Sequence, residues 1–289
     1  MIYTILAGVF FAGQNLASRA FSKTFEQGIY QLITLNVLAT LMGSAALFVL
    51  FRPGMISLTA MLFAAAFGTL FVATISMIMV TYSKGPMGIS SMMIDMSVMI
   101  LVLFSTIVWR ETPTLIRGIA MAMLLTVLVL LSLPDKKENR AATRSWFIIA
   151  LVTMIMNGTL SILQKSAFMV CPELSSTDFT FWSMAMAFAV STLAFLGMKL
   201  LGKKRFSQGQ PLKKLPLIAA GQGLGTAAAY YCSNAALLRQ QSIIVFPVIV
   251  FVNVGLLMLI SVIFFGEKIN LRRGIAFVMG LAGTVMMNL

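Results

Sequence analysis

The 289-residue chain contains no histidine, two cysteines and only eight acidic residues. Without histidine, His-based metal sites, histidine proton relays and Ser-His catalytic triads are excluded. The cysteines, Cys171 and Cys232, form no CxxC pair, which argues against a disulfide framework or a zinc site. The run Gly221–Gly225 superficially matches a dinucleotide loop, but no strand precedes it. The sequence therefore predicts a non-enzyme with no cofactor and no metal.

Charged residues are scarce as a class. They make up 10% of the chain, hydrophobic residues make up 60%, and the mean hydropathy is +0.97. Globular proteins carry about 25% charged residues, because their surface has to face water. The chain is thus predicted to lie in a lipid bilayer. Its net charge of +13 is better explained by basic loops that fix orientation than by a nucleic-acid partner.

Long apolar stretches dominate what remains. A bilayer core needs about 20 apolar residues per helix, and the sequence divides into ten such stretches. The predicted fold is an all-α membrane protein of ten transmembrane helices: 2–22, 28–51, 58–83, 86–108, 113–133, 145–169, 177–200, 214–238, 241–264 and 269–289.

An internal repeat organises these stretches. Residues 104–133 and 260–289, offset by 156 positions, are identical at 12 of 30 positions, where chance would give roughly three. The matches include a Glu-x5-Arg-Gly element, Glu111 to Gly118 and Glu267 to Gly274. Each half then holds five spans, so the halves cross the membrane in opposite directions, as in secondary transporters. We expect a first repeat at 1–134, an inter-repeat loop at 135–144 and a second repeat at 145–289.

This pattern resembles the EamA-like branch of the drug/metabolite transporter superfamily. The resemblance rests on two five-helix halves that each end in a short loop with Glu, a basic residue, Gly and a last helix. The family's proline in the ninth helix matches Pro247, but the first half has Ser91 in its place. The resemblance implies a transporter of amino acids, amines or related metabolites or drugs, with its cavity between the halves.

Basic residues are distributed unevenly between the two predicted membrane sides. The loops after odd-numbered spans, with their flanks, hold sixteen Lys and Arg. The opposite side holds five, namely Arg52, Arg110, Arg117, Lys165 and Arg239. The positive-inside rule therefore predicts both termini outside the cytoplasm, in a multi-pass protein of the cytoplasmic membrane.

Asp95 is the acidic residue predicted to lie deep in the membrane. The span that holds it begins near Pro86, which places Asp95 about 14 Å inside at 1.5 Å per residue. A carboxyl at the bilayer centre costs about 2.5–3.5 kcal/mol on insertion scales and usually faces a cavity or a partner. We interpret Asp95 as the coupling residue for proton exchange or as the ligand of a cationic solute. The alternative is a structural carboxyl that is protonated or paired with lysine.

Amides, hydroxyls and tyrosines inside the spans complete the candidate substrate site. Unpaired polar groups are costly in lipid, so these side chains should face the interior. For any single amide the simpler role is an interhelical hydrogen bond. The set comprises Gln14, Asn15, Ser18, Asn36, Asp95, Asn157, Gln164, Gln222, Tyr230, Tyr231, Asn234 and Asn253. Glu111 and Glu267 are expected to cap or pin the helices that follow them, with Gly118 and Gly274 in the same motif.

The favoured function is a secondary transporter that moves a small organic solute by alternating access, most simply outward. An uptake carrier for a quaternary amine and a channel-like facilitator are the alternatives within transport. An intramembrane enzyme or a signalling subunit is the competing class, but one deep carboxylate supplies no paired-carboxylate chemistry. We expect a monomer or a homodimer whose partners are the solute and the lipid bilayer.

Overall fold

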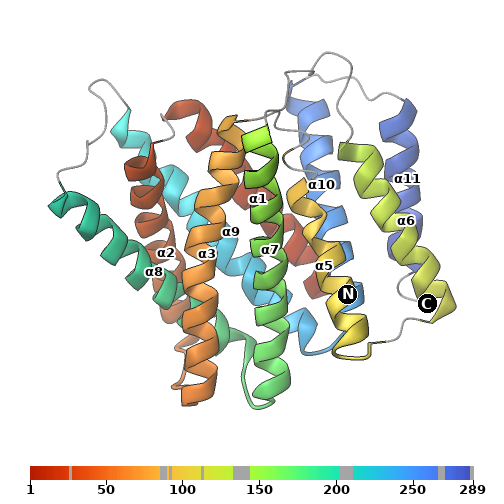
Figure 1. Cartoon of the computed structure of the whole chain (residues 1–289), viewed down its shortest axis with the longest axis horizontal. Coiled ribbons are helices and arrows are strands. Elements are labelled where there is room, and N and C mark those ends of the chain that lie inside the picture. The colour runs from red at the N-terminus through yellow and green to blue at the C-terminus, as the bar shows by residue number, and fades with distance from the viewer. Residues whose placement is uncertain are drawn as a thin grey trace.

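A computed structural model describes residues 1–25, 28–84, 90, 93–111, 114–132, 144–201, 211–265 and 271–286. Every regular element within these ranges is a helix (Figure 1). The predicted all-helical class is therefore confirmed. The elements are α1 (Ile2–Thr24), α2 (Ile29–Phe51), α3 (Leu58–Lys84), α5 (Ser97–Ile107), α6 (Leu115–Ser132), α7 (Arg144–Val170), α8 (Ser176–Leu200), η1 (Leu212–Lys214), α9 (Leu215–Leu237), α10 (Ser242–Phe265) and α11 (Leu271–Met286).

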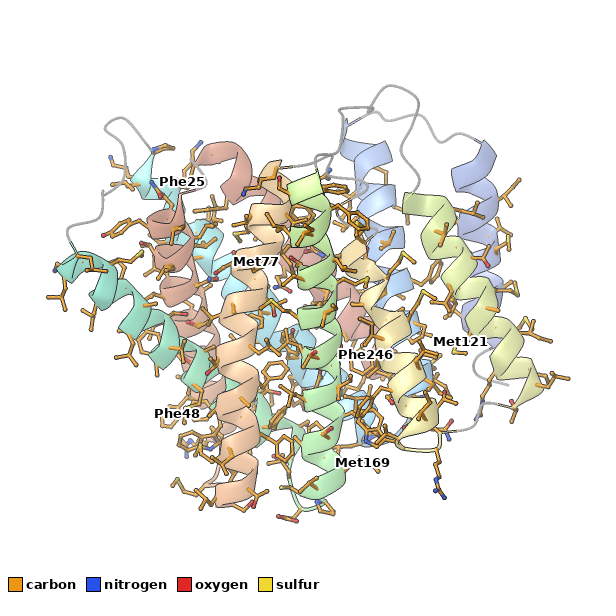
Figure 2. The ribbon with its side chains drawn as sticks, in the orientation of Figure 1. Phe25, Phe48, Met77, Met121, Met169 and Phe246 are labelled. Atoms are coloured by element: carbon orange, nitrogen blue, oxygen red, sulfur yellow. The ribbon has the colours of Figure 1, made fainter. Side chains whose placement is uncertain are left out.

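Four stretches in the described ranges are long and apolar enough to cross a membrane: Ile29–Phe51, Leu58–Tyr82, Ser145–Val170 and Ser176–Leu200. The outer surface fits the same environment, because large apolar side chains project from it. Phe48 is 58% exposed and Met169 is 52% exposed, whereas Phe25 and Phe246 are buried (Figure 2). The chain is thus a multi-pass membrane protein. Its predicted ten-span, two-repeat organisation stays a prediction.

The helices pair across the two halves of the chain in a symmetric scheme. Helix α1 packs on α9 and α10, and α7 packs correspondingly on α3 and α5. Helix α2 packs on α9 as α8 packs on α3. Three further pairs join helices that hold the same position in the two halves, α2 with α8, α5 with α10, and α6 with α11. Contacts outside this scheme include those of α10 with α6 and of α8 with α9. Figure 1 shows the α6–α11 pair at one end of the molecule and α8 at the other.

Glycines allow the closest of these crossings. A Cβ built at Gly68 of α3 would lie 2.7 Å from backbone atoms of Ser183 and Ala187 on α8. A Cβ built at Gly223 of α9 would overlap the backbone carbonyl of Ala39 on α2. The two glycines are 155 positions apart, one fewer than the offset of the terminal repeat. Gly68 in the first half and Gly223 in the second thus each permit a close backbone approach between the two halves.

The glycine run that resembled a nucleotide loop is a packing element. A Cβ at Gly225 would lie 3.2 Å from the Gln14 backbone nitrogen, and one at Gly221 would lie 3.5 Å from Ala17. Both of these partners belong to α1, whereas Gly223 meets α2. The run thus lets α9 pack closely against two helices of the first half. Its residues are helical, which agrees with the sequence argument against a nucleotide-binding loop.

Candidate functional site

A small cavity lies where α2, α3, α8 and α9 meet. Its free volume is about 10 Å³, the room that one water molecule needs. Four wall residues are polar, and each of the four is only 2% exposed. The lining consists of Asn36, Ala39, Thr40, Phe71, Met184, Gln222, Gly223 and Thr226.

The cavity lies at the mid-depth of the helices that form it. Thr40 is the central residue of the 23-residue α2, and Thr226 is the central residue of the 23-residue α9. Phe71 is the central residue of the 27-residue α3. Polar side chains at the centre of long apolar helices are costly in lipid, which makes this cavity the candidate functional site.

The polar wall is built from the same element on two helices. On α2, the Thr40 hydroxyl donates to the Asn36 carbonyl oxygen at 2.6 Å. On α9, the Thr226 hydroxyl donates to the Gln222 carbonyl oxygen at 2.7 Å. An amide residue is thus followed, four positions later and on the same helix face, by a threonine that bonds back to it.

Gln222 carries one of the buried polar atoms that the described part of the fold leaves unsatisfied, and among those atoms it is the one on a residue that lines the cavity. Its Oε1 is buried and accepts no hydrogen bond from any described residue. Such a group is rare in native structures, because an unpaired buried acceptor costs about 1–3 kcal/mol. A molecule in the cavity, either a water or a polar group of a ligand, can supply the missing partner.

Other predicted site residues are engaged in hydrogen bonds between helices. The Asn15 amide donates to Asn253 Oδ1 at 3.0 Å and joins α1 to α10. The Asn157 amide donates to Ser97 Oγ at 2.8 Å and joins α7 to α5. These residues hold the two halves together and do not line the cavity.

A fully buried amide network joins α7, α8 and α9. Gln164 Nε2 donates to Ser233 Oγ at 2.9 Å and to Asn234 Oδ1 at 2.8 Å. Asn234 Nδ2 in turn donates to Thr180 Oγ1 at 2.7 Å. All four side chains are 1% exposed, and their mutual bonds replace the water that they lose on burial.

The two tyrosines have different surroundings. Tyr230 meets Phe11, Phe67 and Phe71 edge-to-face, with ring centroids 5.2–5.7 Å apart. Because Phe71 lines the cavity, Tyr230 lies one side chain behind its wall. Tyr231 stacks on Phe51 near the end of α2, with the ring centroids 5.0 Å apart.

Three further predicted site residues, Gln14, Ser18 and Asp95, also lie outside the cavity wall. On α1, the Ser18 hydroxyl donates to the Gln14 carbonyl oxygen at 3.1 Å, and the Gln14 side chain is buried. Asp95 is half-buried and lies within the apolar helical stretch Met93–Ile107, two residues before Ser97. The cavity and Asp95 are therefore separate features of the fold.

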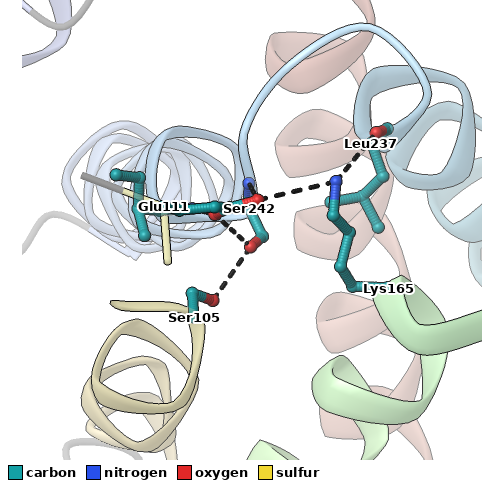
Figure 3. Close-up of polar contacts among 6 residues, drawn as sticks. Ser105, Glu111, Lys165, Leu237 and Ser242 are labelled. Carbon is teal, nitrogen blue, oxygen red and sulfur yellow. Dashed lines mark hydrogen bonds and ion pairs between the residues drawn. The ribbon is translucent and has the colours of Figure 1, made fainter. Parts of the chain in front are cut away.

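A charged cluster lies at the junction of α5, α7, α9 and α10 (Figure 3). Lys165 Nζ is 3.6 Å from Glu111 Oε1 and donates to the Leu237 carbonyl oxygen at 3.5 Å. Glu111 also accepts hydrogen bonds from Ser242 N at 3.3 Å, Ser242 Oγ at 2.7 Å and Ile243 N at 3.2 Å. The Ser242 hydroxyl lies 2.9 Å from that of Ser105. A carboxylate and a lysine thus fix the last carbonyl of α9 and the first amides of α10.

Glu111 was expected to cap the helix that follows it, α6, but its hydrogen bonds go to the start of α10. Arg110 adopts a left-handed conformation, with φ of 53°, and the Glu111 N–H donates to the Ser105 carbonyl oxygen at 3.1 Å. This turn directs Glu111 back toward α10. The start of α6 is served by Thr114, which accepts from Arg117 N at 3.4 Å.

The remaining motif residues are less informative. A Cβ at Gly118 would meet nothing within 4 Å, so no close helix contact requires this glycine. Gly274 is half-buried near the start of α11. Glu267 lies outside the described residues.

Comparison with known proteins identifies the family. The model of the EamA-like transporter family matches residues 144–289. The chain belongs to the EamA-like transporter family. The resemblance found in the sequence is thereby confirmed, and the family is one of membrane transporters. A search of curated proteins found no relative.

The fold of this EamA-like protein is shared with a solved structure. A chain described as "Crystal structure of protein" superimposes with a TM-score of 0.73, over 99% of this chain and 94% of the other. The two sequences are 15% identical, so the likeness concerns the fold alone.

Sequence reasoning identified the cavity amides Asn36 and Gln222 but missed the threonines beside them. The available signal was the repeated spacing of an amide followed by threonine four residues later, once in each half. It also missed the pairing of Lys165. A lysine inside the predicted 145–169 span was a signal for a buried partner, because an unpaired ammonium is costly there.

Proposed function

We propose that this EamA-like protein is a secondary transporter that carries a small organic solute by alternating access, with its solute site at the mid-depth cavity. The observation that carries the proposal is the cavity wall, where Asn36 and Thr40 of the first half face Gln222 and Thr226 of the second half. A site shared by two halves changes its exposure when one half rocks against the other. The symmetric helix pairing and the paired glycine crossings support the inverted-repeat organisation on which this motion depends.

Three finer features belong to the same proposal. Asp95 couples transport to a proton gradient from its place outside the cavity wall. The solute is an amino acid, an amine or a related metabolite or drug, and transport is outward across the cytoplasmic membrane; both follow from the resemblance to the family. The excess of basic residues on one side supports termini outside the cytoplasm.

The test is solute flux in proteoliposomes. A library of small solutes is first screened for those that raise the melting temperature of the purified protein, because a ligand of the native state stabilises it. The solutes that stabilise are then measured in counterflow. We expect saturable exchange that depends on a solute on the opposite side. Unsaturated electrical conductance, or stabilisation by solutes that never cross the membrane, would refute the carrier.

A variant of the wall connects flux to the cavity. Thr226→Val keeps the shape of the side chain but removes its hydroxyl, and it should lower the rate of exchange. Thr74→Val is the matched control, since the Thr74 hydroxyl is also buried and bonds back along its own helix, to the Leu70 carbonyl oxygen at 2.7 Å. Thr74 does not line the cavity. Equal loss of exchange in both variants would separate transport from the cavity.

A further inference from the structure

On the wall of the mid-depth cavity, free hydrogen-bond acceptors outnumber free hydrogen-bond donors. The Thr40 and Thr226 hydroxyls both give their protons to backbone carbonyls of their own helices, at 2.6 and 2.7 Å. Each hydroxyl has one proton and two lone pairs. What remains at both positions is therefore an acceptor.

Asn36 uses one of its two N–H donors outside the cavity. Its Nδ2 donates to Ser76 Oγ at 3.3 Å. The Ser76 hydroxyl gives its own proton to the Val72 carbonyl oxygen at 2.8 Å, so it can only accept from Asn36. This contact fixes the orientation of the Asn36 amide and leaves the Oδ1 acceptor and one N–H of Nδ2 without a partner among the described residues.

Gln222 adds a further acceptor, because its buried Oε1 has no donor among the described residues. Even with the N–H groups of Gln222 Nε2 and the second N–H of Asn36 counted as donors, the lone pairs of the two hydroxyls and two amide oxygens outnumber the donors on this wall. The other residues on the wall offer a backbone glycine and apolar side chains, Ala39, Phe71 and Met184. None of the described residues that line the cavity is charged. A positive ligand would therefore lose its hydration without gaining a counter-charge, which is unfavourable.

We propose that this cavity recognises an uncharged NH2 group, of the kind that a primary carboxamide carries, on the transported solute. The assignment rests on the proposed function and specifies its solute. An NH2 group gives two protons to the acceptor wall, whereas a hydroxyl gives one and a quaternary ammonium gives none. The free volume of about 10 Å³ suits one such group and no bulky head. A single aromatic residue, Phe71, lines the cavity, so the described wall also lacks the aromatic cage that quaternary ammonium ligands use.

The proposal is tested with four probes that each have an unbranched four-carbon skeleton, in which the carboxamide carbon of the first is the fourth carbon: butyramide, butylammonium, butyltrimethylammonium and butanol. The readout is the rise in melting temperature of the purified full-length protein. We expect butyramide to stabilise the protein at the lowest concentration. Equal or greater stabilisation by butyltrimethylammonium, butanol or butylammonium would overturn the assignment, as would a lack of response to butyramide.

Two wall variants connect the response to the cavity. Gln222→Met is nearly isosteric and should weaken the apparent affinity for butyramide roughly three- to tenfold, the value of one hydrogen bond. Thr226→Val provides the same test if Gln222→Met does not fold. Thr74→Val, whose buried hydroxyl lies outside the cavity, should keep the affinity of the parent protein. Unchanged affinity in the folded wall variants would overturn the assignment.

Failure here differs from failure of the transport proposal. If the protein exchanges a solute that lacks an NH2 group, the carrier stands and the recognition proposal falls. If it binds butyramide through Gln222 but exchanges no carboxamide across the membrane, the recognition proposal stands and the carrier falls.

Discussion

Glu111 and Lys165 form an ion pair, with 3.6 Å between Oε1 and Nζ, in which 11% and 10% of the respective side chains are exposed. The two residues come from opposite halves of the chain, and the pair holds the start of α10 and the end of α9. A buried pair adds little net stability compared with an apolar pair of the same shape, but breaking it leaves a lone buried charge.

Lys165→Met should therefore destabilise the protein by about 3–5 kcal/mol, because Glu111 loses its counter-charge. Glu111→Gln combined with Lys165→Met should recover part of this loss, since no unpaired charge remains. Thermal unfolding in detergent measures both effects. Lys214→Met, at an exposed lysine of η1, is the control and should change little. A double variant less stable than Lys165→Met alone would contradict the interpretation.

Gly223→Ala should destabilise the protein by about 1–3 kcal/mol, because the new methyl group meets the rigid carbonyl of Ala39. Gly13→Ala is matched in chemistry and lies in α1, where an added Cβ meets nothing within 4 Å. It should be neutral or stabilising by up to about 1 kcal/mol, because alanine favours helix. Melting temperatures of the two variants check the difference, and equal values would argue against the close α2–α9 crossing.

Gln164→Met and Gln222→Met should have opposite effects on stability. Gln164 donates to both Ser233 and Asn234, so its loss leaves buried acceptors unpaired and costs about 1–3 kcal/mol. Gln222 has an unsatisfied Oε1, so Gln222→Met should be neutral or stabilising in the absence of solute. Chemical unfolding of the purified variants measures both. If Gln222→Met is the more damaging of the two, the Gln222 amide has a structural role.

Asp95→Asn should abolish gradient-driven accumulation of the solute and leave solute exchange intact, because the amide cannot release a proton. Proteoliposomes with and without an imposed pH gradient separate the two activities. Glu173→Gln is the control, since Glu173 is an exposed acid in the link between α7 and α8. Gradient-driven accumulation at the parental level in Asp95→Asn would remove Asp95 from the coupling step.

A reporter that is active only in the cytoplasm should be inactive when fused to the C-terminus and active when inserted at 135–144. The expectation follows from sixteen basic residues on one predicted side and five on the other. The internal insertion is the positive control for expression and folding of the fusion. A strong signal from the C-terminal fusion, with none from the insertion, would reverse the orientation.

The helices themselves were predictable, because their apolar stretches are long and sharply bounded. The predicted 28–51 and 241–264 stretches agree with α2 (Ile29–Phe51) and α10 (Ser242–Phe265) to within one residue at each end. Membrane-length hydrophobicity is a property of composition alone and needs no tertiary information.

The site was predictable only in part. The sequence shows that a residue within a span is polar, but it does not show which group its side chain will contact. Asn36 and Asn157 are both intramembrane asparagines, yet Asn36 lines the cavity and Asn157 binds Ser97 on a neighbouring helix. The difference is set by helix rotation and crossing, which depend on contacts such as that between Gly223 and Ala39. The partner of Glu111 was missed for a related reason, since a left-handed Arg110 turns the motif away from the helix that follows it in sequence.

The capping of α10 by Glu111 has a consequence for the order of assembly. The carboxylate and the Ser242 hydroxyl that it binds are 131 positions apart, and Lys165 lies between them in the sequence. During synthesis, Glu111 and Lys165 are therefore both made before α10 emerges. The pair can form first and give the incoming helix a ready acceptor for its unpaired amides. A second half expressed without the first would lack this acceptor, so we expect it to fold less well alone than when the first half is co-expressed.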